Sequence, residues 1–282
     1  MKLTILGSGS PEAHAARASS GYLIETADAK ILFDCGGGSM GRLLQAGHLP
    51  SQITHLFFSH LHSDHMMDYA RLIHAAWDEG GPPMAVYGPA PLARITEKLF
   101  GPDGVFAHDL NARTLFKPSQ DVWRARGGTL PRPWPAPVVA EISPGFAFDA
   151  GGWRLTTCEV PHAQPHLACL ALSIEAEGRK LTYSGDAGLC DSLIALAQDA
   201  DLLIHWCYRM EGEPADDIMR RLSPSPSQIG KVAAAARARR LLLTHIRKQH
   251  DTEPTLSAAM AAVAQTYNGP AGIASDGQVV TL

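Results

Sequence analysis

One stretch of the sequence, residues 53–65, concentrates side chains of the types that bind metal ions. It begins as an apolar run, which predicts a buried strand, and ends in three histidines and an aspartate within six positions. Alternation along an extended segment puts His60, His62 and Asp64 on one side. Imidazole nitrogens and carboxylate oxygens are ligands of zinc-like divalent ions. With His65 there are four such groups, more than one open catalytic ion needs, so the stretch predicts parts of two metal sites.

Three further ligand-type residues follow apolar runs elsewhere in the chain. His162, Asp186 and His245 each come just after a predicted strand. Strands hold the side chains at their ends rigidly at a sheet edge, where such residues can meet. A single histidine is more often structural, but three such endings beside the first motif favour a shared site. His166 is the rival of His162, which lies closer to the preceding strand.

Three other polar residues have both a functional and a structural interpretation. Asp34 ends a predicted strand before three glycines, and it is either a hydrogen-bond acceptor for a ligand histidine or a turn-forming aspartate. His205 ends another strand, and it is either the proton donor to a leaving group or a core histidine. His55 lies inside a strand and is interpreted as structural.

Composition narrows the classes of protein. The 282 residues are 45% hydrophobic and 18% charged, as in a globular core, and the net charge of −4 argues against a broad basic surface for nucleic acid. Five scattered cysteines without a Cys-x-x-Cys predict reduced thiols in a cytoplasmic protein. No apolar run approaches the roughly 20 residues that span a bilayer, and none at the N-terminus is long enough for a signal peptide.

The elements that must position these residues alternate between strands and helices, and no linker divides the chain, so a single domain over residues 1–282 is expected. Residues 101–144 have a weaker pattern rich in Gly, Pro and Arg, which predicts an insertion or lid near the cleft. Strands are expected at 2–6, 21–25, 30–34, 53–58, 85–88, 153–160, 169–176, 180–183, 202–205, 241–244, 273–274 and 279–282. Helices are expected at 40–46, 66–77, 91–100, 191–198, 225–239 and 254–265.

The pattern His60-x-His62-x-Asp64-His65, followed in order by a histidine, an aspartate and a histidine, resembles the signature of the metallo-β-lactamase superfamily. The resemblance covers nearly the whole chain. It implies an α/β fold, a four-layer αββα sandwich with metals in a cleft at one edge of two sheets. By resemblance the first metal is held by His60, His62 and His162, and the second by Asp64, His65 and His245. Asp186 would bridge the two.

The same resemblance implies two divalent ions per chain, with zinc expected and manganese or iron as alternatives. Two ions can share a hydroxide, lower its pKa and stabilise charge on the substrate. Asp64 could orient that hydroxide. The expected enzyme is a metal-dependent hydrolase of the esterase or phosphodiesterase type.

Within the superfamily the chain is most similar to the ribonuclease Z and arylsulfatase-like branch, through residues 6–11, 19–24, 34–36 and 243–245. Two features depart from a tRNA endonuclease. His205-Trp206-Cys207-Tyr208 stands where that enzyme carries His-Glu-Ala-Thr, and no long basic arm is visible. The primary expectation is therefore a small ester or phosphodiester substrate, with no membrane partner, nucleic acid not expected and a homodimer left open. The alternatives are a ribonuclease Z-type tRNA 3′-processing endonuclease and a non-catalytic nucleic-acid-binding member of the fold.

Overall fold

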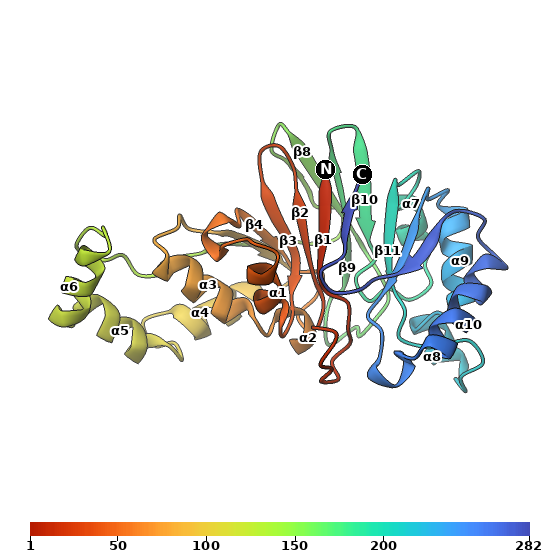
Figure 1. Cartoon of the computed structure of the whole chain (residues 1–282), viewed down its shortest axis with the longest axis horizontal. Helices are drawn as coiled ribbons and strands as arrows, with labels where there is room; N and C mark the ends of the chain where they lie inside the picture. Colours follow the sequence, from red (N-terminus) through yellow and green to blue (C-terminus); the bar gives the residue numbers. More distant parts are fainter.

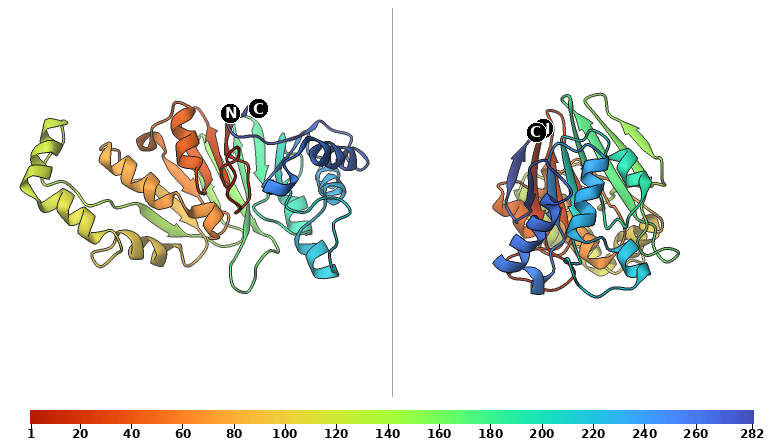
Figure 2. Two further views of the ribbon diagram at one scale, coloured as in Figure 1. Left: turned by 60° about the horizontal axis from the view of Figure 1, so that its bottom comes forward. Right: turned by 90° about the vertical axis from the view of Figure 1, so that its right-hand side faces the viewer.

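Two seven-stranded β-sheets face each other in the computed structural model, which describes residues 1–282. Helices cover the outer face of each sheet, so the layers run helix, sheet, sheet, helix (Figure 1). The view along the long axis shows the two sheets side by side between the helical layers (Figure 2). The predicted αββα sandwich is confirmed. No helix combines the length and the apolar character needed to cross a membrane.

The first sheet is antiparallel from β14 to β3 and parallel from β3 to β6. Its strands, in spatial order, are β14 (Val279–Thr281), β1 (Lys2–Gly7), β2 (Gly21–Glu25), β3 (Lys30–Cys35), β4 (His55–Phe57), β5 (Ala85–Gly88) and β6 (Val138–Glu141).

The second sheet is parallel from β13 to β10 and antiparallel from β10 to β7. Because β8 and β10 are both antiparallel to β9, they run in the same direction as β12, and their C-terminal ends lie at one edge. Its strands, in spatial order, are β13 (Ala271–Ile273), β12 (Leu241–Thr244), β11 (Leu202–Trp206), β10 (Arg179–Tyr183), β9 (Leu170–Ala176), β8 (Trp153–Glu159) and β7 (Ala147–Asp149).

Ten α-helices and two 3-10 turns connect the strands. On the side of the first sheet lie α1 (Ser39–Gln45), η1 (Pro50–Gln52), α2 (Ser63–Met66), α3 (Tyr69–Asp78), α4 (Leu92–Phe100), α5 (Ala107–Leu115) and α6 (Lys117–Ala125). On the side of the second lie α7 (Asp191–Leu196), α8 (Asp217–Leu222), α9 (Pro226–Ala235), η2 (Lys248–His250) and α10 (Glu253–Ala264).

Three hydrophobic clusters match the layers. The central one joins the inner faces of both sheets, with Phe33 and Phe57 from the first sheet and Leu172 from the second. A second cluster packs α1, α3 and α4 onto the first sheet, and a third packs α7, α9 and α10 onto the second. This alternation of side chains between two apolar faces explains why most strands read as continuous hydrophobic runs.

Two regions differ most from the sequence-based expectation, and β7 and α8 were also not expected. The helix expected at 66–77 is divided into α2 and α3, because the backbone N–H of Asp68 donates to the carbonyl of Cys35 and its carboxylate accepts from the backbone of Gly38 and Met40. The segment 101–144, expected to be an insertion or lid with at most short helices, contains α5, α6 and β6, and α5 and α6 project away from the sheets (Figures 1 and 2). Helix α6 buries no residue and is mostly polar, with Lys117, Gln120, Asp121 and Arg124 among its nine residues, so its pattern was weak in the sequence.

The strand ends near the first motif are shaped by close backbone approaches. A side chain at Gly36 would place its Cβ 2.0 Å from the carbonyl oxygen of Asp64, so only glycine lets β3 approach the motif. Asp34 and His245 have φ of 57° and 63°, in the left-handed region that such residues enter mainly at special sites. Both turns direct chemically active side chains toward the same edge of the sheets.

Candidate metal centre

Three histidines from two loops form the first half of a donor cluster. His60 follows β4, His62 precedes α2, and His162 follows β8. The Nδ1 atom of His62 lies 3.1 Å from His60 Nε2 and 3.2 Å from His162 Nε2. The Oδ2 atom of Asp186 lies 3.9 Å from His60 Nε2 and 3.8 Å from His162 Nε2. Four donors therefore converge on one point.

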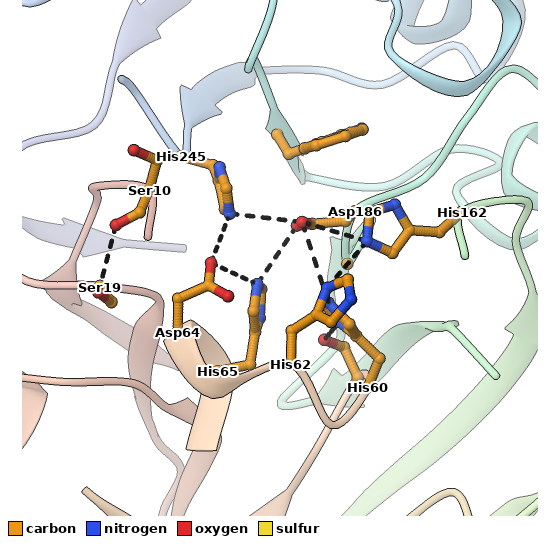
Figure 3. A network of polar contacts seen from close by, with 12 residues as sticks. Ser10, Ser19, His60, His62, Asp64, His65, His162, Asp186 and His245 are labelled. Carbon is orange, nitrogen blue, oxygen red and sulfur yellow. Dashed lines mark hydrogen bonds and ion pairs between the residues drawn. The ribbon is translucent and has the colours of Figure 1, made fainter. Parts of the chain in front are cut away.

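The second half of the cluster comes from α2 and the end of β12. His245 Nε2 lies 3.0 Å from Asp64 Oδ2 and 3.3 Å from Asp186 Oδ2. His65 Nε2 lies 3.4 Å from Asp64 Oδ2 and 3.5 Å from Asp186 Oδ1. Figure 3 shows Asp186 between the two halves, with its carboxylate in reach of both. All seven residues that the sequence predicted as ligands are brought together.

The donors fit divalent metal ions. They form three overlapping groups of potential ligands, and within each group the atoms lie within 4.8 Å of one another. In a tetrahedral zinc site the Zn–N distance of about 2.0 Å separates the ligands by about 3.3 Å, close to the contacts within each half. His65 Nε2 and Asp186 Oδ1 are buried and have no hydrogen-bond partner in the protein, which is costly for polar atoms unless a cation is bound.

A buried carboxylate orients one of these histidines. Asp34 is fully buried, and its Oδ2 accepts hydrogen bonds from His65 Nδ1 at 2.8 Å, Ser59 Oγ at 2.8 Å and Tyr183 at 2.9 Å. Because Nδ1 of His65 donates its proton to Asp34, Nε2 is left with a lone pair that faces the cluster. This is the arrangement that fixes ligand histidines in metalloproteins.

The two carboxylates of the cluster are held in the ionised form. Burial opposes the charge of Asp186, but the neighbouring His245 and His65 outweigh it and lower the pKa of this carboxyl far below its usual range. Burial likewise opposes the charge of Asp64, and hydrogen bonds from His245 and His65 lower its pKa. Two negative charges in a buried site favour a bound cation.

The histidines divide according to their distance from these carboxylates. Burial lowers the pKa of His60 and His162, which keeps them in the neutral form that binds metals. Burial acts in the same direction on His65 and His245, but Asp186 outweighs it and raises their pKa. The charge that favours a proton on these two rings would equally favour a divalent ion in its place.

A cavity of about 280 Å³ opens onto the cluster. No residue of the segment 101–144 lines it. A larger cavity, of about 480 Å³, lies between α4 and the Pro-rich segment before β6, but it contains no metal-binding cluster. The smaller cavity therefore carries the chemistry. Its lining residues are Pro11, His62, Asp64, His162, Asp186, Trp206, Tyr208, Met219, Leu222, Ser223 and His245.

At the end of β11 the structure favours the second of the two interpretations of His205, a core histidine, over the proton donor. His205 is fully buried and does not line the cavity, whereas the next residue, Trp206, does. Burial lowers the pKa of His205 to about 4, and its Nδ1 contacts the carbonyl of Trp206. The side chain of His205 lies on the same face of β11 as those of Leu203 and Cys207, which pack against α7, α9 and α10. Alternation along β11 puts Trp206 on the face opposite to His205, with the core residue Ile204, but no signal in the sequence shows that Trp206 lines the cavity.

A four-layer αββα sandwich with a His/Asp cluster at its strand ends defines the class of fold found in metallo-β-lactamase superfamily hydrolases. The family profile described as the β-lactamase superfamily domain matches residues 29–246. The chain belongs to this family and has the fold of its metal-dependent hydrolases.

Relatives place the chain near the ribonuclease Z branch. A ribonuclease Z from Myxococcus xanthus is 26% identical over 314 residues, covering 100% of this chain and 98% of its own. The metallo-β-lactamase fold protein YhfI from Bacillus subtilis superposes with a TM-score of 0.76 at 23% identity, with 99% of each chain covered. The short form of human tRNase Z superposes with a TM-score of 0.68 at 21% identity, covering 100% of this chain and 99% of that one.

These relatives overturn the expectation of a small-molecule substrate without a nucleic-acid partner. Several ribonucleases Z match the chain, and that enzyme acts on RNA. The expectation relied on the altered stretch at His205, on the absence of a long basic arm and on the net charge of the whole chain, whereas contacts with phosphates depend on local charge. The sequence also hid the projecting helices α5 and α6, which resembled irregular chain.

Proposed function

We propose that the protein is a metal-dependent phosphodiesterase that cleaves RNA, of the ribonuclease Z type. The observation that carries this proposal is the complete set of seven donors in a chain that aligns with a ribonuclease Z over its whole length. We assign His60, His62 and His162 to one ion, Asp64, His65 and His245 to the other, and Asp186 to both. When bound, two divalent ions at such a centre activate water and stabilise charge that develops on the phosphoryl group.

Asp64 is suited to orient the attacking water. Its Oδ2 contacts both His245 and His65, while its Oδ1 is free to accept a hydrogen bond from a water molecule. The lowered pKa of Asp64 keeps its carboxylate ionised at neutral pH. The carboxylate therefore stays available as a hydrogen-bond acceptor for the attacking water. The half-buried rings of His62 and His162 line the cavity beside it.

The protonation of the leaving hydroxyl is where this chain departs from the His-Glu-Ala-Thr stretch of tRNA endonucleases. His205 was the predicted proton donor. With a pKa of about 4 it is neutral at pH 7, and it does not line the cavity. A leaving group here is therefore more simply protonated by solvent or by a residue of the cavity itself.

The test uses one zinc-loaded preparation, a labelled precursor tRNA with a 3′ trailer, and bis(p-nitrophenyl) phosphate as a reporter of the metal centre. We expect a discrete cleavage of the precursor that disappears with Asp64→Ala. If the protein hydrolyses the reporter but leaves every RNA intact over the same time, the proposal of an RNA substrate is wrong. Mapping the cut to the 3′ end of the tRNA would distinguish tRNA processing from general RNA cleavage.

A further inference from the structure

The side of the cavity that faces the donor cluster is apolar and aromatic. Trp206 and Tyr208 come from the end of β11, and Met219 and Leu222 from α8. We call these four residues the aromatic wall. None of them belongs to the donor groups. The cavity therefore has two unlike sides, one of buried charges and one of aromatic and aliphatic surface.

The indole of Trp206 is fixed against both halves of the donor cluster. Its Nε1 donates a hydrogen bond to the carbonyl of Ala187, and only 5% of the residue is exposed. Its ring lies 5.4 Å from the ring of His162 at 85°, and 5.6 Å from the ring of His245 at 83°. A group that touches this indole is therefore held next to the reacting centre.

Tyr208 extends the aromatic surface beyond Trp206. Its ring lies 5.9 Å from that of Trp206 and is inclined to it by only 28°. The guanidinium of Arg247 lies 4.7 Å from the ring of Tyr208 and is anchored by Glu12, whose Oε1 accepts from Nε at 2.9 Å. The cation, itself held by Glu12, fixes the phenol ring, so this part of the wall is preorganised.

Helix α8 also lines the cavity, through Met219 and Leu222, without being part of the core. It buries none of its own residues, and Met219 is 48% exposed. Two contacts fix its C-terminal end: Leu189 N donates to the carbonyl of Arg221 at 2.8 Å, and Arg209 Nε donates to that of Ser223 at 2.9 Å. Leu222 and the adaptable Met219 are thereby presented to the cavity at a defined distance.

We infer that the aromatic wall is a subsite for one unpaired nucleobase next to the scissile phosphate. This inference rests on the proposed function, and it names the part of the RNA that the site recognises. With the phosphate at the donor cluster, an adjoining base reaches the aromatic side, where stacking tolerates any base because every base has a π-face. A cavity of about 280 Å³ is small for a base pair, so we expect the base that it accepts to be unpaired.

The test compares ligands that differ only in the base. Adenosine 5′-monophosphate, uridine 5′-monophosphate and ribose 5-phosphate are titrated into the zinc-loaded protein by calorimetry. We expect both nucleotides to bind about tenfold more tightly than ribose 5-phosphate, within the range that stacking of one base on an aromatic side chain supplies. Equal affinity for the nucleotides and ribose 5-phosphate would overturn the subsite.

Two variants locate the effect. Tyr208→Ala and Trp206→Leu should reduce the preference for nucleotides over ribose 5-phosphate to less than about threefold. General damage to the site would weaken all three ligands in parallel and leave this ratio unchanged, so the ratio separates a stacking role from a structural one. Phe116→Ala is the control, because Phe116 is 60% exposed and lies between α5 and α6, outside the cavity. A preference that survives in both wall variants contradicts the inference.

The precursor-tRNA assay separates this inference from the proposed function. A preference for nucleotides that depends on the wall, in a protein that cleaves no RNA, supports the subsite and counts against the RNA substrate. RNA cleavage without such a preference supports the substrate and overturns the subsite.

Discussion

The carboxylate of Asp34 determines which nitrogen of His65 faces the donor cluster. Because Nδ1 donates to Asp34 at 2.8 Å, the ring presents Nε2 as a donor atom to a metal. We predict that Asp34→Asn lowers zinc affinity by about 10- to 100-fold, since the amide no longer provides an anionic acceptor. Competition with a chromogenic chelator measures the affinity. Asp28→Asn, at an exposed carboxylate, should leave it unchanged.

A second prediction at the residue scale concerns the ligand set. Asp186→Ala and His162→Ala should each lose metal from a protein expected to hold about two ions per chain, because both side chains lie within the donor groups. His166→Ala should not, since His166 is exposed, and neither should His205→Ala, which lies outside those groups. Elemental analysis after gel filtration gives the stoichiometry. Metal loss from His205→Ala or His166→Ala, with Asp186→Ala unaffected, would refute the assignment.

The elements of the sandwich were largely predictable, because apolar runs of strand length define strands and the donors sit at their ends. Position at a strand end pointed to His162, Asp186 and His245, but it also pointed to Asp34 and His205, and the family resemblance was needed to select the ligand set. The aromatic wall could not be predicted in this way. Trp206 looks like a core residue in sequence, and Met219 and Leu222 reach the cavity only through the tertiary position of α8.

The projecting helices were not predictable for a related reason. Periodicity reveals a helix through the face it buries, and α6 buries none. Helix α5 is anchored by Leu110, which is buried in the cluster of the first sheet, and α6 by aromatic and charged side chains at the end of α3. Arg132 stacks on Trp77 and Trp123 and donates to Asp78 at 2.9 Å, and Arg126 donates to Asp78 at 3.2 Å. The assignment of residues 1–282 to a single domain stays a prediction.

At the element scale, we predict that Asp78→Asn loosens this anchor. Burial raises the pKa of Asp78, but hydrogen bonds from Arg132 and Arg126 outweigh it and lower the pKa overall. The folded-state pKa lies below the unfolded one, so the stabilisation is present above about pH 4 and is lost as pH falls through the lowered value. Because Asp78 is partly exposed, the effect on unfolding should not exceed about 1 kcal/mol.

Limited proteolysis within 101–131 measures this loosening. The wild-type protein should become more susceptible as the pH falls below about 4, and Asp78→Asn should be susceptible already at neutral pH. Asp121→Asn is the matched control, because Asp121 pairs only with Lys117 inside α6 and does not reach α3. Identical cleavage of Asp78→Asn, Asp121→Asn and the wild type at pH 7 would show that Asp78 does not anchor the projection.

At the scale of the whole molecule, charge is unevenly distributed. The chain carries a net charge of −4, yet residues 107–126 hold four basic side chains against two acidic ones. The two cations used below, Lys117 and Arg124, lie on α6, and Arg124 has no acidic partner. Figure 1 shows α6 at one end of the molecule and α9 at the other. An RNA bound in the cavity could extend along the projecting helices α5 and α6. It would then avoid the rest of the molecule, which carries the net negative charge.

We therefore predict that the double substitution Lys117→Gln and Arg124→Gln weakens RNA binding, whereas Arg154→Gln with Lys231→Gln does not. Both pairs remove two positive charges and change the net charge equally, but the second pair lies on β8 and α9. Each lost phosphate contact should lower the slope of log K against log salt by about 0.7 to 0.9, since fewer counterions are released. Fluorescence anisotropy with a labelled tRNA, between 50 and 200 mM salt, measures the slope.

Hydrolysis of bis(p-nitrophenyl) phosphate should stay at the wild-type rate in both variants, because none of the four residues lines the cavity. If both pairs weaken binding equally, RNA responds to the overall charge of the protein and the projection has no special part in holding it.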